Sequence, residues 1–123
     1  MIKEYAREYF LSLHEVMQNI SLEKFEKIIT ILTEAYNNGA TIYTMGNGGS
    51  GSTASHLVCD LNKGVSFDLD KRFKVMCLND NIPSVLAYAN DISYSDIFIS
   101  QLKNCLNTDD VVLGISGSGN SDN

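Results

Sequence analysis

Hydrophobic residues recur every three or four positions through the N-terminal part of the chain. From residue 2 to residue 20 this spacing places the apolar side chains on one face of an amphipathic helix. Ser21 is a typical N-cap for a second helix, and Gly39 is a typical left-handed residue after its end. The pattern therefore predicts two N-terminal helices, over residues 2–20 and 22–38.

After residue 40 the apolar residues gather in short, nearly continuous runs, which predict strands. These runs cover residues 41–45, 73–78 and 111–115. Helical patterns separate them, over residues 54–62, after the cap Asn81 with Pro83 in the first turn, and over residues 95–106. Strands that alternate with helices predict a parallel sheet covered on both faces, and buried parallel strands are typically apolar throughout. We therefore expect an α/β fold.

Two loops rich in glycine and serine follow the first and third predicted strands, at residues 46–53 and 116–121. In parallel sheets, ligands bind at the carboxyl ends of the strands. Glycine lets backbone N–H groups turn toward an anion, and the next helix directs its N-terminus to the same place. Serine hydroxyls add uncharged donors, which suit an acidic protein that binds an anion. The two loops together predict a site for a single phosphate monoester.

Two other phosphate ligands fit the first loop less well. Gly46, Gly48 and Gly51 match the dinucleotide-binding pattern, but Asp80, the nearest acid at a strand end, comes 34 residues after Gly46. The pattern requires an acid about 20 residues on. The spacing also approaches that of a nucleotide-binding P-loop, but Ser52 stands where that loop has its lysine. We therefore expect no nucleotide cofactor.

Length, charge and cysteine usage limit the class of protein. A chain of 123 residues suits one domain, which we expect to span residues 1–123, with helices over 2–38 and an α/β part over 40–123. The net charge of −6 and the lack of a basic cluster argue against a nucleic-acid partner. No apolar run is long enough to predict a membrane span. The three widely spaced cysteines, all in apolar contexts, predict reduced thiols in the core of a cytoplasmic protein.

His56 and Asp60 are four residues apart on the helix predicted after the first loop, so they share a face. A histidine and a carboxylate in this arrangement can act as an acid–base pair or bind a metal ion. An exposed pair on a helix surface, with no chemical role, is the alternative.

Taken together, these motifs resemble the phosphoheptose isomerases, which are sugar isomerase (SIS) domain proteins. The resemblance rests on GNGGS at residues 46–50, His56 and Asp60, Asn90-Asp91, and GISGSGNS at residues 114–121. It implies a flavodoxin-like, three-layer α/β/α sandwich of about five parallel strands, of which the chain would cover the first part. It also implies a homotetramer formed through the N-terminal helices, and interconversion of sedoheptulose 7-phosphate and D-glycero-D-manno-heptose 7-phosphate.

The resemblance also suggests roles for individual residues. Catalysis or zinc binding falls to His56 and Asp60, and substrate binding falls to Asn47, Gly48, Gly49, Ser50, Asp91, Ser116, Ser118 and Ser121.

Three departures from the family pattern qualify the implied activity. Asp60 stands where the family usually has glutamate, and Gly117 replaces a common threonine. Two later functional residues of the family, a glutamine and a histidine, would lie beyond Asn123. A non-catalytic SIS regulator or adaptor that binds a phosphosugar is therefore the alternative function.

Overall fold

The computed structural model describes residues 1–123, and the chain divides into two compact units, residues 1–31 and 32–123. Helix α1 spans Ile2–Gln18, and helix α2 spans Leu22–Asn38 and crosses from one unit to the other. Both predicted N-terminal helices are confirmed. The amide of Lys24 donates to the Ser21 hydroxyl over 3.3 Å, which confirms the predicted cap. Gly39 adopts a φ of 69°, as predicted.

In the first unit, the apolar face predicted for the N-terminal helix is exposed. No residue of α1 is buried within this chain. Large apolar side chains remain exposed to solvent, with Tyr9, Phe10 and Val16 among them. None of the helices of the chain has the length and apolar character needed to cross a membrane.

The second unit contains a three-stranded parallel sheet. Its strands are β1 (Thr41–Gly46), β2 (Lys74–Cys77) and β3 (Val111–Ile115), in the order β2-β1-β3. Gly46 at the end of β1 pairs with Ile115 at the end of β3. The three predicted strands and their parallel arrangement are confirmed, with strand ends that differ by at most one residue.

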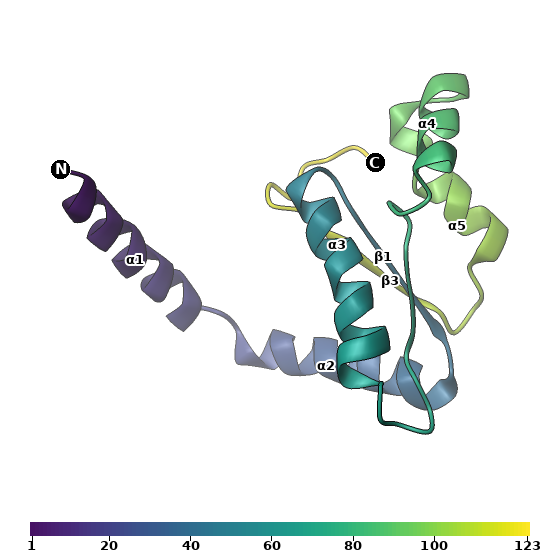
Figure 1. Cartoon of the computed structure of the whole chain (residues 1–123), viewed down its shortest axis with the longest axis horizontal. Helices are drawn as coiled ribbons and strands as arrows, with labels where there is room; N and C mark the ends of the chain where they lie inside the picture. Colours follow the sequence, from purple (N-terminus) through teal and green to yellow (C-terminus); the bar gives the residue numbers. More distant parts are fainter. The chain divides into compact units, whose positions relative to one another are not determined.

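Alternating residues of β1 face two different helical layers. Ile42 packs with Ala35 of α2 and with side chains of α3 (Gly49–Cys59). Tyr43 points the other way and packs with Phe98 and Leu102, beside α4 (Ile82–Asp91) and α5 (Ile99–Cys105). Figure 1 shows α3 on one side of the strands and α4 with α5 on the other. The predicted α/β/α layering is confirmed.

Two predicted boundaries around the first loop are wrong. The loop ends earlier than expected, because α3 begins at Gly49 and includes Ser52 and Thr53. The first amides of a helix lack an intrahelical acceptor, and small polar residues are favourable there. Beyond Cys59 the helix does not end near residue 62 but widens into a π-helix, η1 (Asp60–Val65).

The helix predicted over residues 95–106 is divided. A 3₁₀ turn, η2 (Tyr94–Asp96), precedes α5. The Ser93 hydroxyl donates to the Asp96 carboxylate over 2.6 Å and holds this turn locally. Such bonds from serine compete with a regular helix.

Candidate active site

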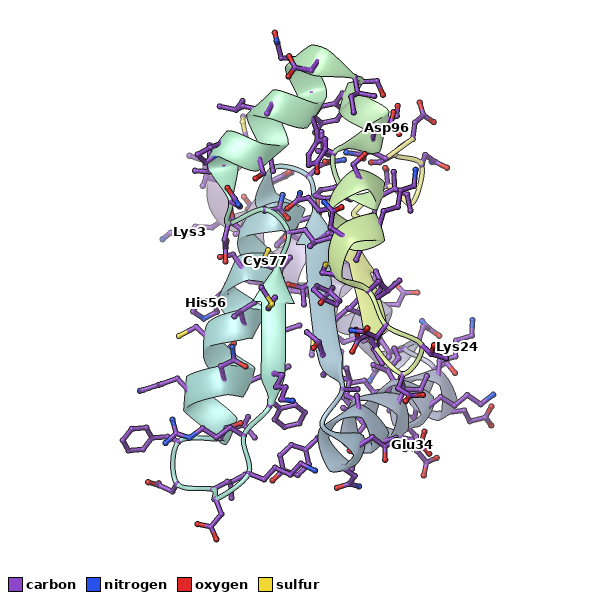
Figure 2. The ribbon with its side chains drawn as sticks, turned by 90° about the vertical axis from the view of Figure 1, so that its right-hand side faces the viewer. Lys3, Lys24, Glu34, His56, Cys77 and Asp96 are labelled. Carbon is purple, nitrogen blue, oxygen red and sulfur yellow. The ribbon has the colours of Figure 1, made fainter.

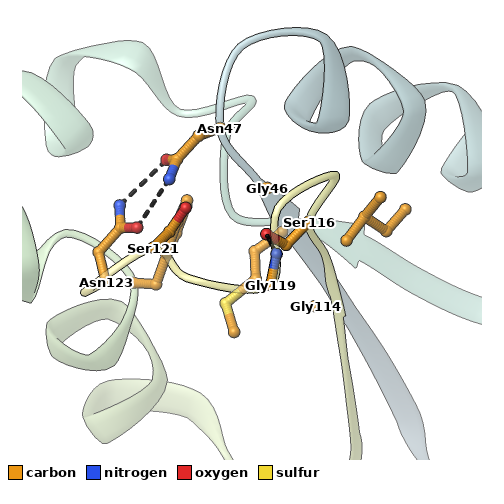
Figure 3. A pocket seen from close by; sticks show the side chains of 10 residues that line it. Gly46, Asn47, Gly114, Ser116, Gly119, Ser121 and Asn123 are labelled. Carbon is orange, nitrogen blue, oxygen red and sulfur yellow. Dashed lines mark hydrogen bonds between the residues drawn. The ribbon is translucent and has the colours of Figure 1, made fainter.

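The two glycine and serine loops leave the same edge of the sheet from neighbouring strands. Between them lies a cavity of about 170 Å³, lined on its polar side by Asn47, Ser116, Ser121 and Asn123 and floored by the buried ring of Phe98. Figure 3 shows these side chains gathered around the ends of β1 and β3. The predicted convergence of the two loops is therefore confirmed.

Gly46 makes the close approach of the first loop to β3 possible. A Cβ atom at this position would lie 2.7 Å from the carbonyl carbon of Ser50 and 2.8 Å from the carbonyl oxygen of Ile115. Both are backbone atoms, so neither can move aside cheaply. Gly48 has a φ of 53°, which favours glycine because it lacks Cβ. The amides of Ser50 and Gly51 donate to the Asn47 carbonyl, whereas those of Gly48 and Gly49 have no acceptor in the chain.

Asn79, just beyond the end of β2, fixes the start of this loop. Its Oδ1 accepts from the Gly46 amide over 3.1 Å, and its Nδ2 donates to the Gly46 carbonyl over 2.7 Å. One side chain thus satisfies both backbone groups of a buried glycine. No sequence motif singled out Asn79. Its position directly after a predicted strand, at the ligand-binding edge, was the available signal.

Asn47 is held by a second amide and by a phenol. Its Nδ2 donates to Asn123 Oδ1 over 2.7 Å, and its Oδ1 accepts from Asn123 Nδ2 over 3.0 Å. The Tyr94 hydroxyl donates to the same Oδ1 over 2.8 Å. These bonds join the first loop, the segment after the second loop, and η2 (Figure 3 shows the amide pair).

The serines of the second loop keep their hydroxyl protons available. Ser116 Oγ accepts from the Gly119 amide over 2.9 Å, and Ser118 Oγ accepts from the Asn120 amide over 3.2 Å. These hydroxyls act as acceptors within the loop, so each O–H remains free to donate to an anion. Ser52 and Thr53 differ, because their hydroxyls donate to carbonyls of their own helix.

Other predicted substrate-binding residues lie outside the cavity wall. Ser50 is half-buried in the first turn of α3, and Gly49 and Ser118 are exposed; none of the three lines the cavity. Asp91, at the end of α4, is exposed, and its carboxylate accepts from the side-chain Nδ2 of Asn90 over 2.7 Å. The structure therefore groups Asn47, Ser116 and Ser121 at the cavity, and places these other residues outside its lining.

His56 and Asp60 lie together on α3 and at the start of η1, as their spacing predicts. His56 Nε2 is 3.4 Å from Asp60 Oδ1, and their side chains are 75% and 58% exposed. Figure 2 shows His56 on the exposed side of α3. His56 lines a second, more open cavity of about 560 Å³ that also contacts Gly48 and Asn79. The adjacent residues Asn47 and Gly48 thus border different cavities.

The metal ligands available in the chain are limited. No group of three or more His, Cys, Asp or Glu side chains is placed to hold a metal ion. Protein zinc sites use at least three protein ligands. His56 and Asp60 supply two donors of suitable chemistry, so these residues do not form a zinc site by themselves.

The clear pKa shifts occur away from the loops. The pKa of Asp110 is lowered because its carboxylate accepts from the backbone amides of Thr41 and Asn107. The pKa of Tyr43 is raised to about 12 by hydrogen bonding to Cys105 and by burial. Both groups organise the sheet rather than the cavity.

Comparison with known proteins identifies the family. The family model described as SIS domain matches residues 4–123. The chain belongs to the SIS domain family. The two loops that converge on the cavity are therefore the glycine and serine loops of an SIS domain.

Individual relatives carry more specific names. The chain is 35% identical over 118 residues to a "Probable phosphoheptose isomerase" of Thermoplasma acidophilum, covering 96% of this chain and 64% of that protein. It is 32% identical over 127 residues to a phosphoheptose isomerase of Helicobacter pylori strain P12, covering 100% of this chain and 65% of that protein. The chain thus spans slightly less than two thirds of these relatives.

Among solved structures, the phosphoheptose isomerase of Neisseria gonorrhoeae superposes with a TM-score of 0.88. The sequences are 25% identical, and the match covers 100% of this chain and 65% of that chain. The SIS domain fold is therefore shown by both sequence and structure.

Proposed function

We propose that this chain forms part of a phosphoheptose isomerase, which interconverts sedoheptulose 7-phosphate and D-glycero-D-manno-heptose 7-phosphate. The observation that carries the proposal is the convergence of two uncharged loops on one cavity at the carboxyl ends of β1 and β3, where the second loop supplies the hydroxyls of Ser116 and Ser121. The names of the related proteins support the choice of sugar phosphate.

The phosphate group of the substrate would occupy the cavity between the loops. The volume of about 170 Å³ is smaller than the ~300–1,000 Å³ of a typical small-molecule site, so it suits the phosphoryl end of the substrate. Hydroxyl protons of Ser116 and Ser121 would donate to the phosphate oxygens, with Ser50 and Ser118 at the margin of the cavity. The sugar would then extend past Asn47, with Asp91 beyond it.

Asp60 is the proposed base. Its carboxylate would take the proton from the carbon next to the substrate carbonyl, and the electron pair of that C–H bond would form the enediol double bond. The carbonyl oxygen gains a proton in this step. Return of the first proton to the neighbouring carbon, with loss of a proton from the other hydroxyl, completes the exchange of aldose and ketose. His56, 3.4 Å from Asp60, would assist this proton transfer.

We also propose that the protein binds zinc, forms a homotetramer and is cytoplasmic. A zinc ion held by His56 and Asp60 would need at least one further donor, which these two residues do not supply. The exposed apolar side chains of α1 support a homotetramer formed through the N-terminal helices. The predicted place of the cysteines in the core is wrong, because Cys59 and Cys105 are exposed and Cys77 is half-buried. None of the three forms a disulfide bond, which supports a cytoplasmic protein.

The test compares Asp60→Asn with Asp68→Asn in the whole protein that contains this chain. Asp68 is also an exposed aspartate that lines neither cavity, but unlike Asp60 it makes no contact with His56. We expect Asp60→Asn to lower kcat by about 10²–10⁴-fold with little change in the affinity for sedoheptulose 7-phosphate, and Asp68→Asn to change neither. Binding without turnover in the unaltered protein would favour a non-catalytic phosphosugar regulator. A lack of binding would overturn the proposal.

A further inference from the structure

The Tyr94 hydroxyl reaches the first loop from a separate part of the fold. It lies in η2, 47 residues from Asn47 in sequence, and donates to Asn47 Oδ1 over 2.8 Å. Neither the glycine loop nor the serine loop contains this tyrosine. The contact therefore connects the cavity wall to the segment that joins α4 and α5.

The side-chain amides of Asn47 and Asn123 can pair in two orientations that form the same number of hydrogen bonds. Rotating both side-chain amides by half a turn exchanges each oxygen with each nitrogen and preserves two reciprocal bonds. A third group must therefore decide which arrangement is populated. Tyr94 is that group, because a phenol donates a hydrogen bond more readily than it accepts one.

The selected arrangement determines what the cavity wall offers a ligand. Asn47 Oδ1 receives two donors, from Tyr94 and Asn123, so its acceptor capacity is used. Each amide nitrogen of the pair donates one proton to its partner and retains one N–H. The wall formed by this pair thus presents donors, which suit oxygen atoms of a phosphosugar.

The geometry points to Tyr94 as a positioning residue that orients Asn47 for binding the sugar portion of the substrate. This inference rests on the proposed function and assigns a role to a residue outside both loops. Tyr94 does not line the cavity, so it acts through Asn47 and not by direct contact. It should influence recognition of the sugar more than recognition of the phosphate, since Ser116 and Ser121 line the cavity without contacting Tyr94.

The experiment uses Tyr94→Phe, with Tyr88→Phe as the matched control. The Tyr88 hydroxyl also takes part in one hydrogen bond, accepting from Asn104 over 3.2 Å, but contacts neither loop. Dissociation constants are measured for sedoheptulose 7-phosphate and for inorganic phosphate. Loss of one neutral hydrogen bond predicts a threefold to tenfold (on the order of 1 kcal/mol) weaker affinity for the heptose phosphate in Tyr94→Phe. Inorganic phosphate should bind both variants as it binds the unaltered protein.

A double-substitution cycle separates orientation of Asn47 from a general structural effect. If Tyr94 acts through Asn47, then adding Tyr94→Phe to Asn47→Ala causes no further loss of heptose phosphate affinity. The inference would be overturned if Tyr94→Phe lowered the affinity for the heptose phosphate equally in the unaltered protein and in Asn47→Ala. It would also be overturned if Tyr94→Phe alone left that affinity unchanged. Failure of the unaltered protein to bind either ligand would instead overturn the proposed function.

Discussion

The cavity between the loops and the exposed pair on α3 are built in different ways. The cavity rests on buried or half-buried groups: Gly46 against β3, Asn79 on the Gly46 backbone, and the ring of Phe98 below. His56 and Asp60 contact each other at 3.4 Å, but solvent surrounds both side chains. Packing sets the geometry of the cavity, whereas the geometry of the His56 and Asp60 side chains depends on what approaches the helix surface. The proposed phosphate site therefore has a geometry set by the fold, whereas the proposed catalytic pair does not.

The largest expected effect comes from filling the space at Gly46. Gly46→Ala would force a Cβ atom against two backbone segments, so we expect a loss of about 3 kcal/mol in the free energy of unfolding. Denaturant unfolding measures this loss. Gly49→Ala is the control, since nothing lies within 4 Å of its added Cβ, and its stability should change by less than about 0.5 kcal/mol. Equal effects at both positions would show that the loop is not tightly packed on β3.

A smaller effect concerns Tyr43, which packs with Phe98 beneath the cavity. Its pKa is raised to about 12, so the folded protein retains the phenol proton at a pH where the unfolded chain has lost it. The contribution of this phenol is complete below about pH 10 and is lost as the pH rises to about 12. Between about pH 10 and pH 12, we expect the free energy of unfolding to fall by about 2–3 kcal/mol more in the unaltered protein than in Tyr43→Phe.

Unfolding measurements at several alkaline pH values, on the two proteins side by side, test this difference. Parallel curves would show that Tyr43 titrates normally and that the layer below the cavity is open to water.

The smallest effect on stability is expected at the exposed pair. His56→Ala removes a contact between two solvated side chains, and exposed pairs of this kind contribute little to the free energy of unfolding. The free energy of unfolding should change by less than about 0.5 kcal/mol, measured by denaturant unfolding at pH 7. A loss above 1 kcal/mol would mean that the pair is part of the folded framework, and the contrast with the cavity would no longer hold.

Particular residues show how far the sequence could be interpreted. The period of the apolar positions predicted the helices and strands, and the caps Ser21 and Asn81 were predicted because capping depends on neighbouring residues alone. The spacing of His56 and Asp60 predicted their contact for the same local reason. Asn79 and Tyr94 were not predicted, because their partners lie 33 and 47 residues away.

By itself, the sequence determined the α/β class, the positions of the two loops at strand ends, and the hydroxyl chemistry they carry, because periodicity and turn residues act over short distances. Only the tertiary structure decided which of those hydroxyls border the cavity. It also placed His56 in a different cavity from Ser116. These features depend on how strands and helices pack, and packing brings together residues that no local pattern connects.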